Sequence, residues 1–278
     1  MLAYDGTYIT RMGMYQADAI VQPVKDLAAQ CVEYMDCLIR EEPLQIHESV
    51  FPVKYQEVDG MGDIYTGPYE CLEVFAKSLE GKTGKVMVAD KGGKQESYPA
   101  GRSHYRLLKI PLEKESQYDV ALENCEVSIC YLSEREDIMQ TGVCFLEWEQ
   151  GAWVAASDLG KWYQTPVREQ YHFCPYKNWI NDPNGLCWYQ GYYHMYYQAN
   201  PHSQKWDQMY WGHTASRDCI HWVHLPYALQ PQEELLDSED GKGGAFSGSA
   251  VALDDRIRFY LTRHIGPQED SEEETRQY

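Results

Sequence analysis

The segment formed by residues 171–185 constrains the fold of this chain most strongly, because it holds one carboxylate between residues that favour turns. Asp182 precedes Pro183, and a residue before proline is pushed out of the helical region into an extended conformation. Asn184 and Gly185 follow, a pair typical of tight turns. The sequence therefore predicts Asp182 at the edge of a strand, next to a turn. The same residues are also compatible with a hairpin turn that has no chemical role.

Short strands separated by tight turns follow this segment. The pattern predicts two similar hairpins, each with aromatic residues in its second strand, and two further strands between the hairpins. The expected strands are residues 186–189, 192–197, 210–215, 221–224, 248–253 and 257–263. Repeated units of strand, turn and strand are typical of β-propellers, so this region is predicted to form one four-stranded blade and the start of the next.

Four blocks in this region resemble the signature sequences of glycoside hydrolase family 32, which contains β-fructofuranosidases such as invertases, inulinases and levanases. The first block, residues 179–185, differs from the family's Trp-Met-Asn-Asp-Pro-Asn-Gly only by the isoleucine at position 180. The other blocks are the stretch with Gln198 and Trp206, the run from Met209 to Trp222, and the Phe-Ser-Gly-Ser at residues 246–249. They follow one another in the family's order and at about its spacing, so the resemblance covers about residues 171–252.

The resemblance implies a five-bladed β-propeller with the site in its central channel, and the hydrolysis of sucrose or fructans with retention of configuration. Asp182 matches the nucleophile of that family, which attacks the anomeric carbon of a fructosyl unit. The implied substrate-binding residues are Trp179, Ile180, Asn181, Gln198, Trp206, Phe246 and Ser247. No cofactor is implied, and the histidines of this region show no spacing typical of a metal site.

Two further carboxylates that the family uses have no counterpart in the expected place. The family's acid lies in a Glu-Cys motif and its transition-state stabiliser in an Arg-Asp-Pro motif, both after the Phe-Ser-Gly-Ser block. Glu70-Cys71 lies far upstream, and Arg217-Asp218 is followed by Cys219. We therefore expect the chain to be the N-terminal part of a longer enzyme, inactive alone. Fructosyl transfer, sugar binding without catalysis, and a relation to arabinose-specific five-bladed glycosidases stay open as alternatives.

The N-terminal half is predicted to form an accessory domain over residues 1–160, joined to the propeller region, residues 166–278. Residues 23–40 show the apolar periodicity of an amphipathic helix. Seven strands rich in β-branched and aromatic residues then predict a β-sandwich, which makes the chain all-β apart from the helix. The expected strands are residues 71–79, 85–89, 104–112, 118–122, 127–132, 142–148 and 153–156. Carbohydrate binding and packing or oligomerisation are both possible roles for this sandwich.

The charge of the chain excludes some partners. Asp and Glu outnumber Lys and Arg by 43 to 24, so the protein should repel nucleic acids and anionic membrane surfaces. The first residues show no basic start followed by an apolar run, and no apolar stretch is long enough to cross a bilayer. These features predict a cytoplasmic protein, and the family resemblance implies sucrose or a fructo-oligosaccharide as its partner.

Overall fold

The computed structural model describes residues 2–3, 18–21, 40, 54–56, 61–149, 152–159, 172–239, 241–266 and 275–277. The chain divides into two compact units, residues 1–58 and 59–278. Apart from Arg40, the helix predicted for residues 23–40 lies outside the described residues. The segment around residue 165, where we expected a domain boundary, also lies outside them, so that boundary stays a prediction.

The first unit contains one small sheet among its described residues. Its strands are β1 (Leu2–Ala3), β2 (Asp18–Val21) and β3 (Lys54–Gln56). Strand β1 runs parallel to β2, and β3 runs antiparallel to β2.

Two antiparallel sheets form the sandwich at the start of the second unit. The five-stranded sheet has the order β12-β11-β10-β5-β8 and the four-stranded sheet the order β4-β9-β6-β7. The strands are β4 (Met61–Tyr65), β5 (Cys71–Ser78), β6 (Lys85–Asp90), β7 (Gln95–Pro99), β8 (Arg106–Pro111), β9 (Gln117–Glu123), β10 (Cys125–Ser133), β11 (Cys144–Glu149) and β12 (Ala152–Ala155). Leu72, Val86 and Ile110 are among the buried side chains between the sheets.

All seven strands predicted for this region are confirmed, with ends that differ by one or two residues. The sequence analysis missed β4 and β7 for different reasons. Strand β4 contains Gly62, which weakens a strand pattern, yet a Cβ at this position would lie 2.8 Å from the ring of Trp148. Strand β7 reads Gln-Glu-Ser-Tyr-Pro and is largely exposed at the edge of its sheet, so it shows no apolar alternation.

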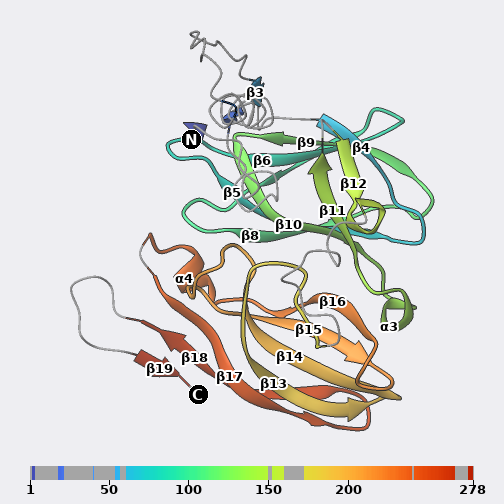
Figure 1. Cartoon of the computed structure of the whole chain (residues 1–278), viewed down its shortest axis with the longest axis vertical. Coiled ribbons are helices and arrows are strands. Elements are labelled where there is room, and N and C mark those ends of the chain that lie inside the picture. The colour runs from blue at the N-terminus through green and yellow to red at the C-terminus, as the bar shows by residue number, and fades with distance from the viewer. Residues whose placement is uncertain are drawn as a thin grey trace. The chain divides into compact units, whose positions relative to one another are not determined.

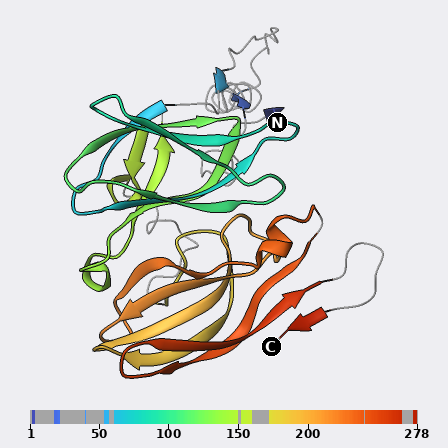
Figure 2. The ribbon, with the colours of Figure 1, turned by 180° about the vertical axis from the view of Figure 1, so that it is seen from behind.

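Two further antiparallel sheets follow, and Figures 1 and 2 show them from opposite sides. One has the order β13-β14-β15-β16, and the other β17-β18-β19. The elements are β13 (Trp179–Tyr189), β14 (Tyr192–Asn200), β15 (Tyr210–Ser216), β16 (Trp222–Leu229), β17 (Gly243–Ala252), β18 (Ile257–Ile265), β19 (Thr275–Gln277) and the short helices α3 (Ile138–Thr141), η1 (Ala156–Leu159) and α4 (Glu233–Leu236). Strand β17 lies beside β13, the first strand of the other sheet.

The described chain is therefore mostly β-strand, as predicted, and its described residues close no propeller ring. Within the same residues, no helix is long and apolar enough to cross a lipid bilayer. The predicted four-stranded antiparallel sheet is present, with its strands in sequence order.

The tight turn predicted at Asn184 and Gly185 is wrong. Both residues lie inside β13, which pairs with β14 along its whole length but slips register twice, between Ile180 and Pro183 and between Asn184 and Cys187. Each slip places one extra residue in β13, which defines a β-bulge. Gly185 has a φ of 53°, so the positive φ that glycine adopts readily in turns is used here in the second bulge. Bulges and turns need the same residues, which is why the sequence pattern misleads here.

The sandwich and the second pair of sheets share a buried aromatic cluster. Phe75, Tyr105 and Tyr131 of the sandwich pack in it with Tyr210 of β15. The ring of His202, in the loop after β14, stacks on Tyr105 at 4.3 Å between centroids. Since both halves contribute buried side chains, this contact fixes the loop between β14 and β15 against the sandwich.

Candidate active site

Strands β13 and β17 place Asp182 and Ser247 next to each other. Asp182 lies in the first bulge of β13, and Ser247 lies in a bulge of β17 between Ala245 and Gly248. The Ser247 hydroxyl donates a hydrogen bond of 2.7 Å to Oδ2 of Asp182. Both side chains are exposed, so the carboxylate faces solvent while it keeps a fixed partner. Bulges re-aim side chains, and here two bulges on neighbouring strands bring the two groups together.

Trp179 and Asn181 extend this hydrogen-bonded group. The indole Nε1 of Trp179 donates a hydrogen bond of 2.7 Å to Oδ1 of Asn181. Because the Asn181 oxygen accepts this bond, the amide N–H groups are the part of the side chain left to donate. The Asn181 side chain also hydrogen-bonds the Asp182 carboxylate. The predicted residues Trp179, Asn181, Asp182 and Ser247 therefore form one continuous group.

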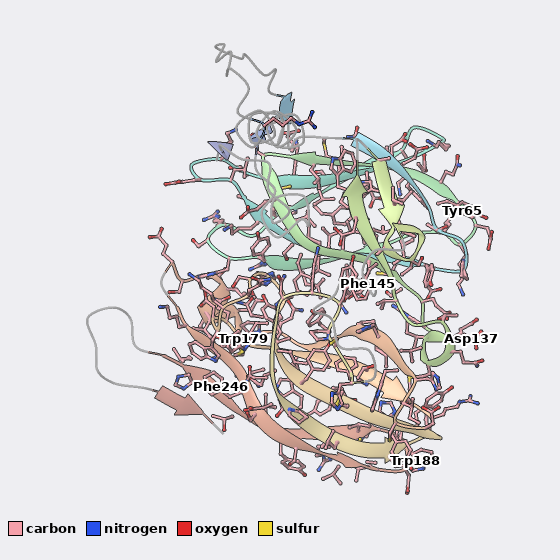
Figure 3. The ribbon with its side chains drawn as sticks, viewed as in Figure 1. Tyr65, Asp137, Phe145, Trp179, Trp188 and Phe246 are labelled. Atoms are coloured by element: carbon pink, nitrogen blue, oxygen red, sulfur yellow. The ribbon has the colours of Figure 1, made fainter. Side chains whose placement is uncertain are left out.

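Two predicted aromatic residues meet beside that group. The rings of Trp206 and Phe246 contact edge to face, with centroids 6.0 Å apart at an interplanar angle of 76°. Trp206 is 46% exposed, so much of its ring surface stays accessible. In Figure 3, Trp179 and Phe246 lie at one end of the two sheets, whereas Trp188 lies at the opposite end. The site is thus an open surface with a carboxylate beside flat aromatic faces.

Gln198 and Ile180 differ from the other predicted residues in their surroundings. Gln198 is buried, and its Nε2 donates a hydrogen bond of 2.6 Å to the backbone oxygen of Ala245. It therefore ties β14 to β17 directly before the Phe-Ser pair at 246–247. Ile180 is 36% exposed and lies between Trp179 and Asn181 in β13. Direct contact of either side chain with a sugar stays a prediction.

Residues that the sequence analysis did not select also build the site. Asn184 is buried and its Oδ1 accepts a hydrogen bond of 3.3 Å from the backbone N–H of Gly248, which ties β13 to β17. The indole of Trp211 donates a bond of 3.1 Å to the backbone oxygen of Phe246. A Cβ at Gly185 would lie 2.9 Å from the ring of Tyr196. Asn184 and Gly185 belong to the motif already noted, but the expected turn concealed their role.

The surroundings of Asp182 favour its charged form. The hydrogen bond from Ser247, followed by those from the Asn181 side chain and the backbone N–H of Asp182, holds the pKa of this carboxyl below its usual value. Asp182 is therefore ionised at neutral pH, which suits a nucleophile and not an acid. No described carboxylate contributes to this shift, whereas a second carboxylate close by would raise the pKa.

We expect the Ser247→Ala variant to raise the pKa of Asp182, because the serine hydroxyl is the largest contributor to its lowering. A folded-state pKa that is held down keeps the carboxylate charged to lower pH, so the variant should begin to protonate at a higher pH than the wild type. Carbon NMR of the labelled Asp182 carboxyl across an acid titration measures this directly. A Ser249→Ala variant, changed on the same strand, is the control. An unchanged Asp182 titration in Ser247→Ala would contradict the assigned hydrogen bond.

The site therefore combines an ionised carboxylate, an amide, the exposed ring of Trp206 and the partly exposed rings of Trp179 and Phe246 on a β-sheet scaffold. Residues 172–278 match the family described as "Glycosyl hydrolases family 32 N-terminal domain". This match confirms the resemblance noted in the sequence for residues 172–278.

Curated relatives match about a third of this chain, over a small part of their own length. A levanase of Bacillus subtilis is 49% identical over 90 residues, which are 32% of this chain and 12% of the levanase. An acid beta-fructofuranosidase of Vigna radiata is 48% identical over 86 residues, or 31% of this chain and 12% of that protein. A sucrose-6-phosphate hydrolase of Escherichia coli is 44% identical over 95 residues, or 34% of this chain and 19% of that protein. The chain thus spans less than a fifth of each of these proteins.

One solved structure resembles a larger part of the chain. A glycoside hydrolase family 32 structure from Bifidobacterium adolescentis aligns with a TM-score of 0.71 and 37% identity, covering 78% of this chain and 37% of that one. The family match spans less than half of the chain, so this likeness includes part of the sandwich.

Proposed function

We propose that the site around Asp182 binds the fructosyl unit of sucrose or a fructo-oligosaccharide, and that Asp182 is the nucleophile of a retaining β-fructofuranosidase. The observation that carries the proposal is the ionised, solvent-facing Asp182 carboxylate, held by Ser247 and Asn181. The relatives named levanase and beta-fructofuranosidase support the substrate class. The arrangement of this region within a five-bladed propeller belongs to the same proposal.

The reaction proceeds in two displacements. A carboxylate oxygen of Asp182 attacks the anomeric carbon of the fructosyl unit, and the bond from that carbon to the leaving oxygen breaks while an acid protonates this oxygen. Water, deprotonated by the conjugate base of that acid, then attacks the same carbon and releases Asp182 and fructose. The Asn181 amide is placed to donate to sugar hydroxyls, and the faces of Trp179 and Trp206 are suited to cover the ring.

The acid of this reaction is a separate requirement. Retaining glycosidases place their two carboxyl groups about 5 to 5.5 Å apart. No carboxylate in the described part of the chain contributes to the pKa of Asp182, so the proposal takes the acid from residues other than those described. Substrate binding and attack by Asp182 can thus be tested apart from complete hydrolysis.

An activated donor isolates the first displacement. Fluoride leaves without taking a proton, so β-fructofuranosyl fluoride needs a nucleophile but no acid. We expect the 278-residue chain to gain one fructosyl unit as an ester on Asp182, detected by mass spectrometry of its peptides, while sucrose releases no measurable fructose. The ester should accumulate because no described carboxylate contributes to the pKa of Asp182, which leaves water attack without a base among these residues. No label, or a label on another residue, would contradict the assignment.

A sugar-binding role without catalysis is the second candidate, and the single carboxylate of the described site favours it over fructosyl transfer. Binding of 1-kestose by the chain together with complete absence of the fluoride-derived ester would support this role. Transfer would instead appear as a fructosylated acceptor sugar. The predicted cytoplasmic location stays a prediction.

A further inference from the structure

The two sheets of the sandwich are closed along one edge. Strands β4 and β12 lie next to each other there. Trp148 and Trp153 contact edge to face with centroids 5.2 Å apart, and the Trp153 indole donates a hydrogen bond of 3.4 Å to the backbone oxygen of Val120. The Trp148 ring lies against Gly62, where an added Cβ would come within 2.8 Å of it, so the ring packs tightly at this edge.

The opposite edge is open. Strands β7 and β8 are the outer strands of the two sheets there, and a cleft of about 540 Å³ is lined by residues from both strands, from β6 and β9, and from the adjoining loops. The buried side chains of Val88 and Ile110 line it from the core. Tyr98 and Tyr118, both half-buried, line it together with the loop residues 91–94. Cavities of about 300 to 1,000 Å³ are typical of small-molecule sites.

The tyrosine hydroxyls give the cleft directional hydrogen bonding. The backbone N–H of Glu113 donates a bond of 2.9 Å to the Tyr118 hydroxyl oxygen, so that hydroxyl keeps its own proton for donation. The Tyr98 hydroxyl donates a bond of 2.6 Å to Glu96, which fixes the position of its ring. Each tyrosine thus combines an apolar ring with an anchored polar tip, which suits ligands that are polar at their edges and apolar on their faces.

The charges around the cleft argue against an anionic ligand. Lys91 pairs with Asp119 at 2.8 Å, and Lys94 pairs with Glu96 at 2.7 Å. With both lysines paired, the cleft offers an anion no unpaired cation among its lining residues. The carboxylate of Asp90 accepts a hydrogen bond from the backbone N–H of Lys94 and shapes the loop. The ligand that fits is neutral, rich in hydroxyl groups and about the size of one or two sugar rings.

We propose that this cleft is a carbohydrate-binding site, separate from the site around Asp182, that takes a terminal unit of a neutral fructo-oligosaccharide. The identity of the sugar as a fructoside rests on the proposed function, whereas the cleft and its tyrosines do not. Such a site would hold the chain of an oligomeric substrate to the protein without taking part in its cleavage.

Amide NMR of the full 278-residue chain tests the proposal without a change in the cleft. Addition of 1-kestose is expected to shift the cross-peaks of residues 91–94 and 112–118, and an Asp182→Asn background should leave these shifts unchanged. Inorganic phosphate is expected to shift none of them. Cross-peak shifts confined to residues 179–182 and 246–247 would overturn the proposed binding in the cleft and would support the site around Asp182. Shifts in the cleft without any ester from the fluoride donor would overturn only the proposed reaction.

Titration calorimetry of two variants tests the same binding of 1-kestose in the cleft. Tyr98→Leu keeps apolar volume but removes the ring, and Tyr118→Phe removes only the hydroxyl. We expect Tyr98→Leu to weaken 1-kestose binding at the cleft about tenfold. The control is Tyr260→Ala, which changes an exposed tyrosine of β18 outside the cleft. Unchanged binding in both cleft variants, at unaltered melting temperature, would overturn the proposal.

Discussion

Asp182→Asn is expected to abolish formation of the fructosyl ester from β-fructofuranosyl fluoride. The substitution keeps the size of the side chain and one acceptor oxygen for the Ser247 hydroxyl, but it removes the negative charge that attacks the anomeric carbon. Removing a nucleophile from a hydrolase costs on the order of 10⁴ to 10⁶ in rate, so the labelled peptide should become undetectable. Stopped samples analysed by mass spectrometry over a time course give the rate.

The matched control is Asp254→Asn, which makes the same chemical change at an exposed position after the far end of β17. It should label at the wild-type rate. Trp206→Ala should reduce labelling at low donor concentration, and labelling should recover at high concentration. The substitution deletes part of a binding surface and leaves the carboxylate intact. Near-normal labelling of Asp182→Asn would show that Asp182 has a structural role only.

A stereochemical outcome is linked to the same assignment. Direct attack by Asp182 followed by water attack releases fructose with the configuration of the substrate, whereas a single attack by water inverts it. Carbon NMR of the first-formed product distinguishes the two, since fructose carries no anomeric hydrogen. This measurement needs an enzyme that supplies the acid as well as Asp182.

The sequence grouped the candidate site residues better than it predicted their backbone. Trp179, Asn181 and Asp182 were recognised as a motif, and the structure joins them with Ser247, which lies 65 residues after Asp182. The same motif was wrongly expected to form a turn. Proline and glycine serve turns and bulges equally, and the choice between them depends on whether a neighbouring strand is present, here β14. That information is non-local, so it is not contained in the motif.

The sandwich shows a similar limit. Stretches rich in β-branched and aromatic residues predicted seven of its strands, but β7 has the polar sequence of an exposed edge and gave no signal. The cleft between β7 and β8 was also not predictable, because it arises from the pairing order of strands that are distant in sequence. Single residues did not reveal it, since Tyr98 and Tyr118 fit equally well into a strand pattern.

Lys177→Met is expected to destabilise the protein strongly. Lys177 Nζ lies 3.0 Å from Oε1 of Glu147, and both side chains are almost fully buried, at 4% and 6% exposure. The Tyr176 hydroxyl donates to the same carboxylate oxygen, and the Tyr176 ring stacks on Phe145 at 3.8 Å. Removing one partner of a buried ion pair leaves the other charge unpaired in the interior, which costs about 3 to 5 kcal/mol of the free energy of unfolding.

The effect should reach the candidate site, because Lys177 lies two residues before Trp179, the first residue of β13, while Glu147 belongs to β11 of the sandwich. Urea denaturation followed by tryptophan fluorescence measures the loss. The exposed pair of Lys85 and Glu123 is the control, and Lys85→Met should cost at most about 1 kcal/mol. The double variant Lys177→Met/Glu147→Leu should recover much of the lost stability, because it removes both charges and leaves apolar side chains of similar size. A double variant as unstable as the sum of its single changes would show that the ion pair contributes through shape and not through charge. The link between the sandwich and β13 would then depend on the stacked rings of Phe145 and Tyr176.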